Sequence, residues 1–218
     1  MDFNRDAEWS AVSIGGYVDQ YFSFPFNVAE RSQGFQLWQN GFTNAELDKI
    51  IEIGESVTAE DAKVGGGSPE ESVDSAVRRS RVAWIKPTPE NEWLFVSVCK
   101  IARDLNTQFY GFDLQGLMSL QYTTYTQEEQ GHYDWHVDDM GVADGYSHRR
   151  KLSLTVQLSD PMAYEGGELW VWGREKICAP KLRGLTAAFP ASLLHRVTPV
   201  TAGKRQSLVA WVCGPDAR

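Results

Sequence analysis

The sequence predicts an α+β fold in which a jelly roll, a double-stranded β-helix, is braced by helices from the N-terminal part of the chain. From Leu117 onward, short runs of β-forming residues alternate with turns, which is typical of a jelly roll. Upstream, two segments have the periodicity of amphipathic helices. The 218 residues fit one domain, with 1–110 as a supporting region and 111–218 as the core. The expected strands of the core are 117–125, 132–138, 150–158, 168–173, 184–189, 194–198 and 205–213.

In the supporting region, residues 36–39 are expected to form a strand. Thr43 and Glu46 then form a capping-box pattern, in which the hydroxyl and the carboxylate satisfy free amides at a helix start. This helix is predicted to reach about Ser56. Residues 78–85 are expected to form one further strand.

A second helix is predicted to open at Thr88-Pro89-Glu90, where a capping residue precedes a proline in the first turn. Two polar stretches, 58–77 and 139–148, contain several glycines and read as loops. A loop as long as the first is usually functional or disordered in a compact domain. The apolar stripe of the second helix is Leu94, Val98, Ile101, Leu105 and Phe109.

Composition restricts the class of protein. The 29 acidic and 21 basic residues give a net charge of −8, which argues against general nucleic-acid binding and suits a basic peptide partner. The cysteines, Cys99, Cys178 and Cys213, lack C-x-x-C spacing, so neither a disulfide framework nor a zinc knuckle is expected. No signal-peptide pattern opens the chain, and no apolar run approaches the ~20 residues of a membrane helix. We therefore expect a cytoplasmic protein that binds neither nucleic acid nor membrane.

A histidine and an aspartate lie two residues apart in one β-forming run. Because successive side chains of a strand point to opposite faces, His136 and Asp138 are expected on the same face, as neighbouring ligands of one divalent metal. An isolated pair of this kind is more often a surface feature, so a third ligand is needed, and His195 is the best candidate. Two histidines and a carboxylate suit a non-haem Fe(II) oxygenase but also a catalytic zinc site. His132 and His148 are weaker ligand candidates.

Ten residues after His195 comes Arg205, followed by Ser207 and Trp211 at the same alternation. On the inner face of an otherwise apolar strand, an arginine is unfavourable to bury unless it meets an anionic, flat group. A guanidinium can grip a carboxylate with two parallel hydrogen bonds, and a nearby hydroxyl can add another. Alone, this pattern also fits an edge strand with a solvated arginine. Together with the upstream pair, it indicates a carboxylate-binding site.

As a set, these residues resemble the Fe(II)- and 2-oxoglutarate-dependent dioxygenases, and more closely their prolyl 4-hydroxylase-like branch. The resemblance extends from Leu117 to Val212. It implies a cupin-like double-stranded β-helix and an enzyme that uses Fe(II), 2-oxoglutarate and O2, with ascorbate as reductant. The motifs that carry it are Tyr125, the run Gly131–His136, Asp138, the strand led by Arg150, the run Glu165–Leu169, His195, and Arg205 with Ser207.

The resemblance also implies roles for individual residues. Arg205 would bind the distal carboxylate of 2-oxoglutarate and is counted with the metal ligands as catalytic. Gln157 stands where the animal oxygen-sensing members have a tyrosine that contacts the cosubstrate. The residues so assigned to iron are His136, Asp138 and His195, and those assigned to 2-oxoglutarate are Arg205, Ser207, Tyr125, Gln157 and Trp211.

The favoured reaction is hydroxylation of a C–H bond of a prolyl residue in a peptide or protein, with release of succinate and CO2. Arg81, Trp84 and Trp135 are candidates for contact with that substrate, and the loops 58–77 and 139–148 are candidate lids. Two alternatives stay open. In the first, the oxygenase acts on a free amino acid or another small molecule. In the second, the chain is a metal-binding jelly-roll module without catalysis. Neither the target nor the oligomeric state follows from the sequence.

Overall fold

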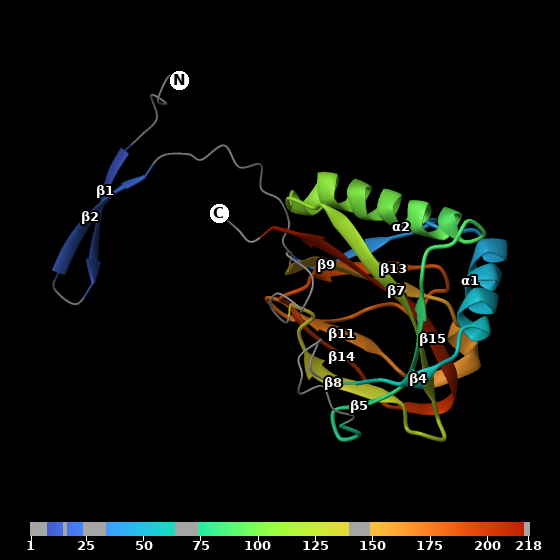
Figure 1. Cartoon of the computed structure of the whole chain (residues 1–218). Helices are drawn as coiled ribbons and strands as arrows, with labels where there is room; N and C mark the ends of the chain where they lie inside the picture. Colours follow the sequence, from blue (N-terminus) through green and yellow to red (C-terminus); the bar gives the residue numbers. More distant parts are fainter. Residues whose placement is uncertain (1–7, 15–16, 24–33, 64–73, 140–148, 216–218) are drawn as a thin grey trace. The chain divides into compact units, whose positions relative to one another are not determined.

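The computed structural model of the chain describes residues 8–14, 17–23, 34–63, 74–139 and 149–215 (Figure 1). By its internal contacts the chain divides into two units, residues 1–31 and residues 32–218. In the first unit, β1 (Glu8–Ile14) pairs antiparallel with β2 (Tyr17–Ser23). The predicted division into a supporting region and a core near residue 110 stays a prediction.

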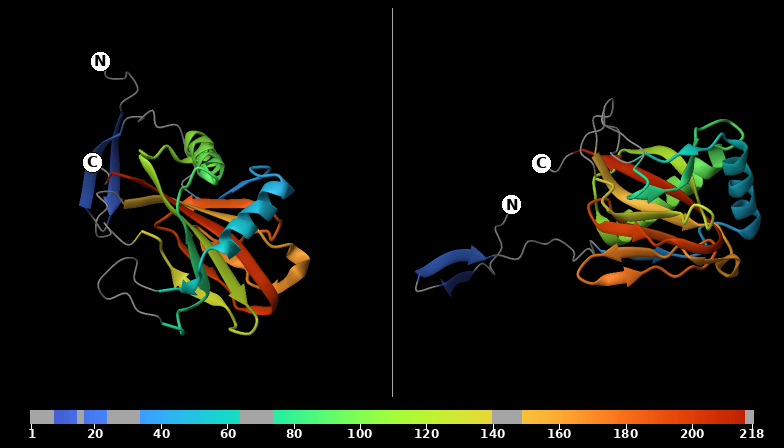
Figure 2. Two further views of the ribbon diagram at one scale, coloured as in Figure 1. Left: turned by 45° about the vertical axis from the view of Figure 1, so that its right-hand side comes forward. Right: turned by 90° about the horizontal axis from the view of Figure 1, so that it is seen from below.

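Residues 32–218 contain two antiparallel sheets that face each other, as expected for a jelly roll (Figures 1 and 2). The larger sheet has the order β3-β13-β9-β15-β7-β6-β4, with β10 paired to β15, and the smaller has the order β12-β11-β14-β8-β5. The strands of the larger sheet are β3 (Gln36–Trp38), β4 (Glu60–Asp61), β6 (Arg81–Ile85), β7 (Gly116–Thr126), β9 (Arg149–Gln157), β10 (Tyr164–Gly166), β13 (Thr186–Pro190) and β15 (Val200–Gly214), and those of the smaller are β5 (Arg78–Arg79), β8 (His132–His136), β11 (Leu169–Trp172), β12 (Lys176–Cys178) and β14 (Leu194–Val197).

Two α-helices pack on the outer face of the larger sheet (Figure 2). The first, α1 (Asn44–Ser56), begins at the predicted capping box of Thr43 and Glu46. The second, α2 (Glu92–Leu105), starts a few residues later than predicted. Residues 88–90 form a turn before it, in which the Asn91 side chain accepts a hydrogen bond from the Thr88 backbone N–H and donates one to the Lys86 carbonyl. A π-helical turn η1 (Asn106–Tyr110) follows α2, and a 3-10 turn η2 (Pro161–Ala163) precedes β10.

Alternation along the strands separates the helix-facing core from the space between the sheets. Even-numbered residues of β9, such as Leu154 and Val156, join the core under the helices. The odd-numbered residues Ser153 and Gln157 instead bond to groups between the sheets. A second, smaller apolar cluster fills part of that space and includes Phe189 and Leu169. The helices therefore stabilise one face of the larger sheet while the other face is free to carry polar side chains.

The segment 78–85 differs from its prediction as one strand. It is divided at Ser80, so that β5 pairs with β8 of the smaller sheet while β6 pairs with β7 of the larger sheet. The parts 64–73 and 140–148 of the two predicted lid loops lie outside the described residues. Within the described ranges, no helix combines the length and the apolar character needed to cross a lipid bilayer.

Candidate active site

Three predicted metal ligands come together between the sheets. His136 ends β8 and is the cross-strand partner of His195 in β14, so the two imidazoles are neighbours although 58 residues lie between them in the sequence. Asp138 is not in the strand with His136, as the alternation argument assumed. The chain has left β8 at this point, because the backbone N–H groups of Asp138 and Asp139 both donate to the carbonyl of Ala191. The turn, rather than the pleat, therefore brings the carboxylate to the imidazoles.

The ligand atoms of these three residues lie within 4.8 Å of one another. The Nε2 atom of His136 is 3.8 Å from Asp138 Oδ1, and the Nε2 atom of His195 is 3.4 Å from Asp138 Oδ2. Each Nδ1 is close to a backbone carbonyl, at 2.7 Å for His136 and 3.0 Å for His195. These contacts favour the tautomer with the proton on Nδ1, which leaves both Nε2 lone pairs directed at the same point.

The protonation states also suit a cation. Burial and the neighbouring His195 lower the pKa of His136 to about 3, so this imidazole is neutral at physiological pH. Burial opposes ionisation of Asp138, but the two imidazoles and a hydrogen bond from Ser153, at 2.7 Å, outweigh it and lower the pKa of that carboxyl. A neutral imidazole at His136 and a carboxylate at Asp138 are the forms that bind a divalent metal without releasing protons.

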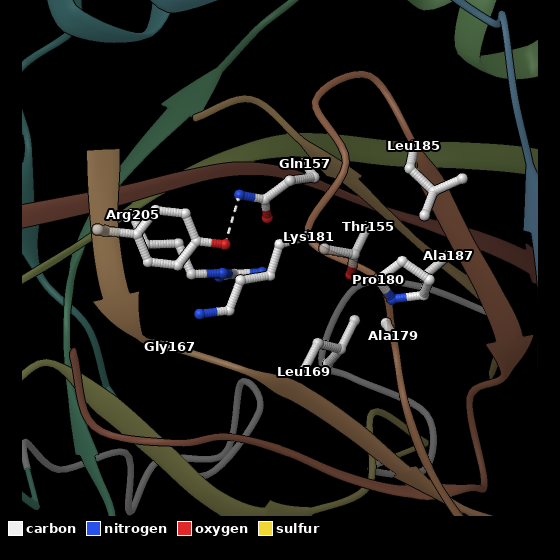
Figure 3. A pocket seen from close by; sticks show the side chains of 11 residues that line it. Thr155, Gln157, Gly167, Leu169, Ala179, Pro180, Lys181, Leu185, Ala187 and Arg205 are labelled. Atoms are coloured by element: carbon white, nitrogen blue, oxygen red, sulfur yellow. Dashed lines mark hydrogen bonds between the residues drawn. The ribbon is translucent and has the colours of Figure 1, made fainter. Parts of the chain in front are cut away.

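A separate small cavity lies between the sheets, around Arg205 (Figure 3). Arg205, Gln157 and Lys181 lie at one end, and apolar side chains such as Leu169 and Leu185 lie at the other. None of the residues that line it is acidic, although it receives two basic side chains. An anion with a short apolar chain matches this lining. The complete set is Thr155, Gln157, Tyr164, Gly167, Leu169, Ala179, Pro180, Lys181, Leu185, Ala187 and Arg205.

The Arg205 guanidinium has unmet hydrogen-bonding capacity. The side chain is only 2% exposed, and its Nε has no hydrogen-bond partner among the described residues. Nη1 donates to the Ser207 hydroxyl at 3.3 Å, and the guanidinium carbon is 5.4 Å from the centre of the Tyr125 ring. Gly167 leaves the room for it, since a Cβ there would be 2.9 Å from Arg205 Cδ. A buried, unpaired guanidinium is unfavourable unless a carboxylate completes it.

The inner face of β9 connects the two features. Ser153 hydrogen-bonds the metal-ligand carboxylate, Thr155 lines the cavity, and Gln157 donates to the Tyr164 hydroxyl at 2.9 Å at the far end. Four residues of a strand span about 13 Å. A five-carbon dicarboxylate that chelates a metal at one end and accepts hydrogen bonds at the other has roughly this reach. The described residues thus fit both a divalent metal at the three ligands and 2-oxoglutarate at Arg205.

The other residues that the sequence assigned to 2-oxoglutarate lie in two places. Ser207 and Tyr125 contact Arg205, as described above. The Trp211 indole faces Asp138 and helps lower the pKa of its carboxyl, although the buried Nε1 makes no hydrogen bond of normal geometry. Trp211 therefore lies on the metal side and is not among the residues lining the cavity.

The three candidate substrate contacts are not gathered in one groove. Trp84 lies beside Trp211, with ring centres 6.0 Å apart. Arg81 is at the sheet edge, where it pairs with Asp61 at 2.6 Å. Trp135 precedes His136 on the opposite face of β8 and packs near Trp172, with ring centres 5.5 Å apart.

Four site residues were missed by the sequence argument. Ser153 and Thr155 had a readable signal, because they alternate with Leu152, Leu154 and Val156 on the same strand as Gln157. Tyr164 and Lys181 had none. They come from a three-residue strand and from the segment before β13, and Lys181 Nζ lies 4.7 Å from the centre of the Tyr164 ring. Their place at the cavity is a result of tertiary packing. His132, by contrast, bonds backbone carbonyls and is not part of the metal-ligand cluster.

Comparison with known proteins agrees with this geometry. Residues 120–213 match the model of the 2OG-Fe(II) oxygenase superfamily. A PKHD-type hydroxylase of Stenotrophomonas maltophilia is 41% identical over 87 residues, which is 38% of this chain and 38% of that protein. One from a Synechococcus strain is 44% identical over 82 residues, 37% of each chain. The aligned part thus spans well under half the length of these relatives.

Solved structures of prolyl hydroxylases share the fold. A prolyl 4-hydroxylase of Pseudomonas putida superposes with a TM-score of 0.64 at 16% identity, covering 84% of this chain and 93% of that one. A Trichoplax adhaerens prolyl hydroxylase, in complex with a peptide fragment of the hypoxia inducible factor oxygen degradation domain, gives a TM-score of 0.65 at 15% identity, covering 83% of each chain. Residues 120–213 are therefore similar to the 2OG-Fe(II) oxygenase superfamily, and the chain shares its fold with the prolyl 4-hydroxylases.

Proposed function

We propose that this protein is an Fe(II)- and 2-oxoglutarate-dependent dioxygenase that hydroxylates a C–H bond, with a prolyl residue of a peptide or protein as the favoured substrate. The observation that carries the proposal is the single strand face on which Ser153, Thr155 and Gln157 lead from the metal ligands to the cavity of Arg205. The named relatives are PKHD-type and prolyl hydroxylases, which supports the choice of substrate class.

In this proposal His136, Asp138 and His195 hold the iron and leave the remaining coordination positions open. Bound Fe(II), 2-oxoglutarate and O2 together supply an oxidant for an unactivated C–H bond, with succinate and CO2 as co-products. Ascorbate keeps the metal reduced. The protein supplies placement: the backbone carbonyls orient the two imidazoles, and Ser153 orients the carboxylate.

The far end of the cosubstrate is held by side chains of four elements. Arg205 and Ser207 of β15 supply hydrogen bonds to the distal carboxylate, and Tyr125 of β7 covers the guanidinium. Burial raises the pKa of Tyr164, so its hydroxyl stays protonated and can donate beside Gln157. The apolar end of the cavity excludes water from the methylene groups.

The test is turnover of 2-oxoglutarate by the full chain with Fe(II), ascorbate and O2, measured as succinate formed. We expect slow uncoupled turnover that rises when the correct substrate is added. His136→Ala should abolish both rates, whereas His132→Ala should keep them, because His132 lies outside the metal-ligand cluster. Absence of succinate under all these conditions would contradict the enzyme and favour a binding module.

A panel of substrates separates the two enzymatic alternatives. Proline-containing peptides are compared with free proline and other free amino acids, with succinate and the hydroxylated product as joint readouts. Stimulation by peptides alone supports a peptidyl prolyl hydroxylase. Stimulation by a free amino acid without any by peptides would replace that substrate class while leaving the oxygenase intact.

A further inference from the structure

A second buried arginine, Arg78, lies next to the metal-ligand cluster and is not used by the cosubstrate. It is in β5, directly across from Tyr133 in β8, and only 8% of its surface is exposed. Its guanidinium carbon is 4.4 Å from the centre of the Tyr133 ring. The same ring stacks on His136, with ring centres 3.4 Å apart and planes at 15°. One tyrosine ring therefore connects Arg78 to a metal ligand.

The partners of Arg78 are neutral. Nε donates to the Ser80 hydroxyl at 2.9 Å, and Nη2 donates to the Gln121 amide oxygen at 3.0 Å. The Thr123 hydroxyl donates to the same amide oxygen, at 3.1 Å. Among the described residues, Arg78 has no carboxylate partner. Gln121 has nearly the same shape as a glutamate, but its amide is neutral. It therefore accepts a hydrogen bond from Arg78 without neutralising the positive charge of the guanidinium.

The surroundings add a second unbalanced charge. Arg150 stacks on Trp211, with its guanidinium carbon 4.1 Å from the ring centre, and it too has no acidic partner in the described part of the chain. Arg78 and Arg150 both act electrostatically on Tyr133. Asp138 is the carboxylate that acts on the same tyrosine among the described residues, and the metal would occupy it. The local charge is thus opposite to the −8 of the whole chain.

Burying a guanidinium without an anion is unfavourable, because hydrogen bonds to neutral groups only partly replace its hydration. Arg78 is also absent from the residues that line the cavity of Arg205, so the distal carboxylate of 2-oxoglutarate is not its partner. An anion that arrives from outside and reaches the Arg78 guanidinium beside Tyr133 satisfies both observations.

We propose that Arg78 binds a carboxylate of the primary substrate, so that the molecule hydroxylated here carries an anionic group close to the C–H bond presented to the metal. The inference rests on the proposed oxygenase function and narrows its substrate class. Two sources have this chemistry, a free α-carboxylate, as in an amino acid or a peptide C-terminus, and an acidic side chain beside the target residue in a longer peptide.

The experiment measures equilibrium binding of matched ligand pairs to the full chain, anaerobically with Fe(II) and 2-oxoglutarate, by titration calorimetry. One pair is a short N-acetylated peptide ending in proline, as the free acid and as the amide. The other is a longer amidated peptide with aspartate or asparagine next to proline. We expect the acidic member of at least one pair to bind about tenfold to a hundredfold more tightly, as a charge-assisted bidentate contact predicts. The pair that responds identifies the source.

Variants then assign that preference to Arg78. Arg78→Gln should remove it, and Arg78→Lys should keep part of it, since the charge remains but the planar fork is lost. Gln121→Glu should also remove it although Arg78 is retained, because the new carboxylate occupies the guanidinium from within. Arg79→Gln is the matched control: it removes the same charge from the adjacent, exposed position, and the preference should persist.

Three results would overturn the proposal: equal affinities for acid and amide in both pairs of the unmodified chain, a preference that survives in folded Arg78→Gln, and weaker binding of 2-oxoglutarate itself in Arg78→Gln without any peptide present. The last result would assign Arg78 to the cosubstrate. Failure of the oxygenase function is distinguishable, because it removes succinate formation while the Arg78-dependent preference in calorimetry remains.

Discussion

We predict that the charge of Arg205 strengthens the binding of 2-oxoglutarate but does not stabilise the ligand-free protein against unfolding. The side chain is 2% exposed, its Nε is unpaired, and its hydrogen-bond partners among the described residues, the Ser207 and Tyr164 hydroxyls, are neutral. A bidentate contact with a carboxylate would therefore use the Nε–H, which no described residue satisfies. Hydrogen bonds to charged groups contribute about 1.5–3 kcal/mol each.

Arg205→Gln removes that contact and keeps a polar side chain of smaller volume. If the bidentate contact is worth about 3 kcal/mol, the Kd for 2-oxoglutarate rises roughly a hundredfold. Without ligand, the same change removes an uncompensated buried charge, so the free energy of unfolding should be unchanged or higher. The assay pairs calorimetric Kd values with urea unfolding of the ligand-free chain.

Two controls isolate the distal carboxylate. The ligand 2-oxobutanoate keeps the 2-oxo acid but has no second carboxylate, so its Kd should be the same for the unmodified chain and for Arg205→Gln. Lys204→Gln removes an equal charge one position away, where the lysine is exposed and paired with Glu55, and should leave both ligands unaffected. The reasoning is refuted if Arg205→Gln weakens both ligands equally or leaves the Kd for 2-oxoglutarate within about threefold.

Four further outcomes can be measured. His136→Ala should lower the affinity for Mn(II), followed by electron paramagnetic resonance, at least about a hundredfold; equal affinity would exclude His136 as a ligand. Lys181→Met should raise the Kd for 2-oxoglutarate a few-fold and make that Kd less dependent on salt concentration, because the Lys181 amine is a partly exposed second cation at the cavity. An unchanged salt dependence of the Kd would argue against a contribution of Lys181 to binding. Gly167→Ala should abolish 2-oxoglutarate binding in calorimetry, since φ is +58° and the new methyl group meets Arg205; normal binding would show that the cavity can yield. Burial raises the pKa of Tyr122 from 10.0 to about 12, so the unfolded chain loses this proton at a lower pH than the folded chain. The free energy of unfolding should therefore fall between pH 10 and pH 12, by up to about 2 kcal/mol. In urea unfolding, Tyr122→Phe should lose this part of the pH dependence.

The parts of the fold that were predictable are those fixed by local patterns. The capping box of Thr43 and Glu46 begins α1 where it was expected, because the two hydrogen bonds involve residues three apart. The strands of the larger sheet follow their alternation, since one face packs under the helices. The division at Ser80 was not predictable in this way. It depends on which sheet each half joins, and that is decided by pairing with β7 and β8, whose paired residues lie 35 to 55 positions further along the chain.

The site shows the same contrast. His136, His195 and Arg205 could be proposed from spacing because each lies in a regular strand. Asp138 was proposed correctly as a neighbour of the imidazoles but for the wrong reason, since the Ala191 carbonyl and not the pleat turns it inward. Tyr164 and Lys181 had no local pattern. Short strands and connecting segments acquire their partners only when the sheets close around the cavity.

The larger sheet separates stability from chemistry residue by residue. On β15, Leu208 and Ala210 are buried in the core under the helices, while Arg205, Ser207 and Trp211 are buried between the sheets among polar groups. Both sets are almost inaccessible, so burial alone does not distinguish them. The difference is that Leu208 and Ala210 have no polar side-chain atoms to satisfy, whereas Arg205 Nε and Trp211 Nε1 have no hydrogen-bond partner among the described residues. On β15, unmet hydrogen-bonding capacity rather than exposure therefore distinguishes the face on which a ligand is expected.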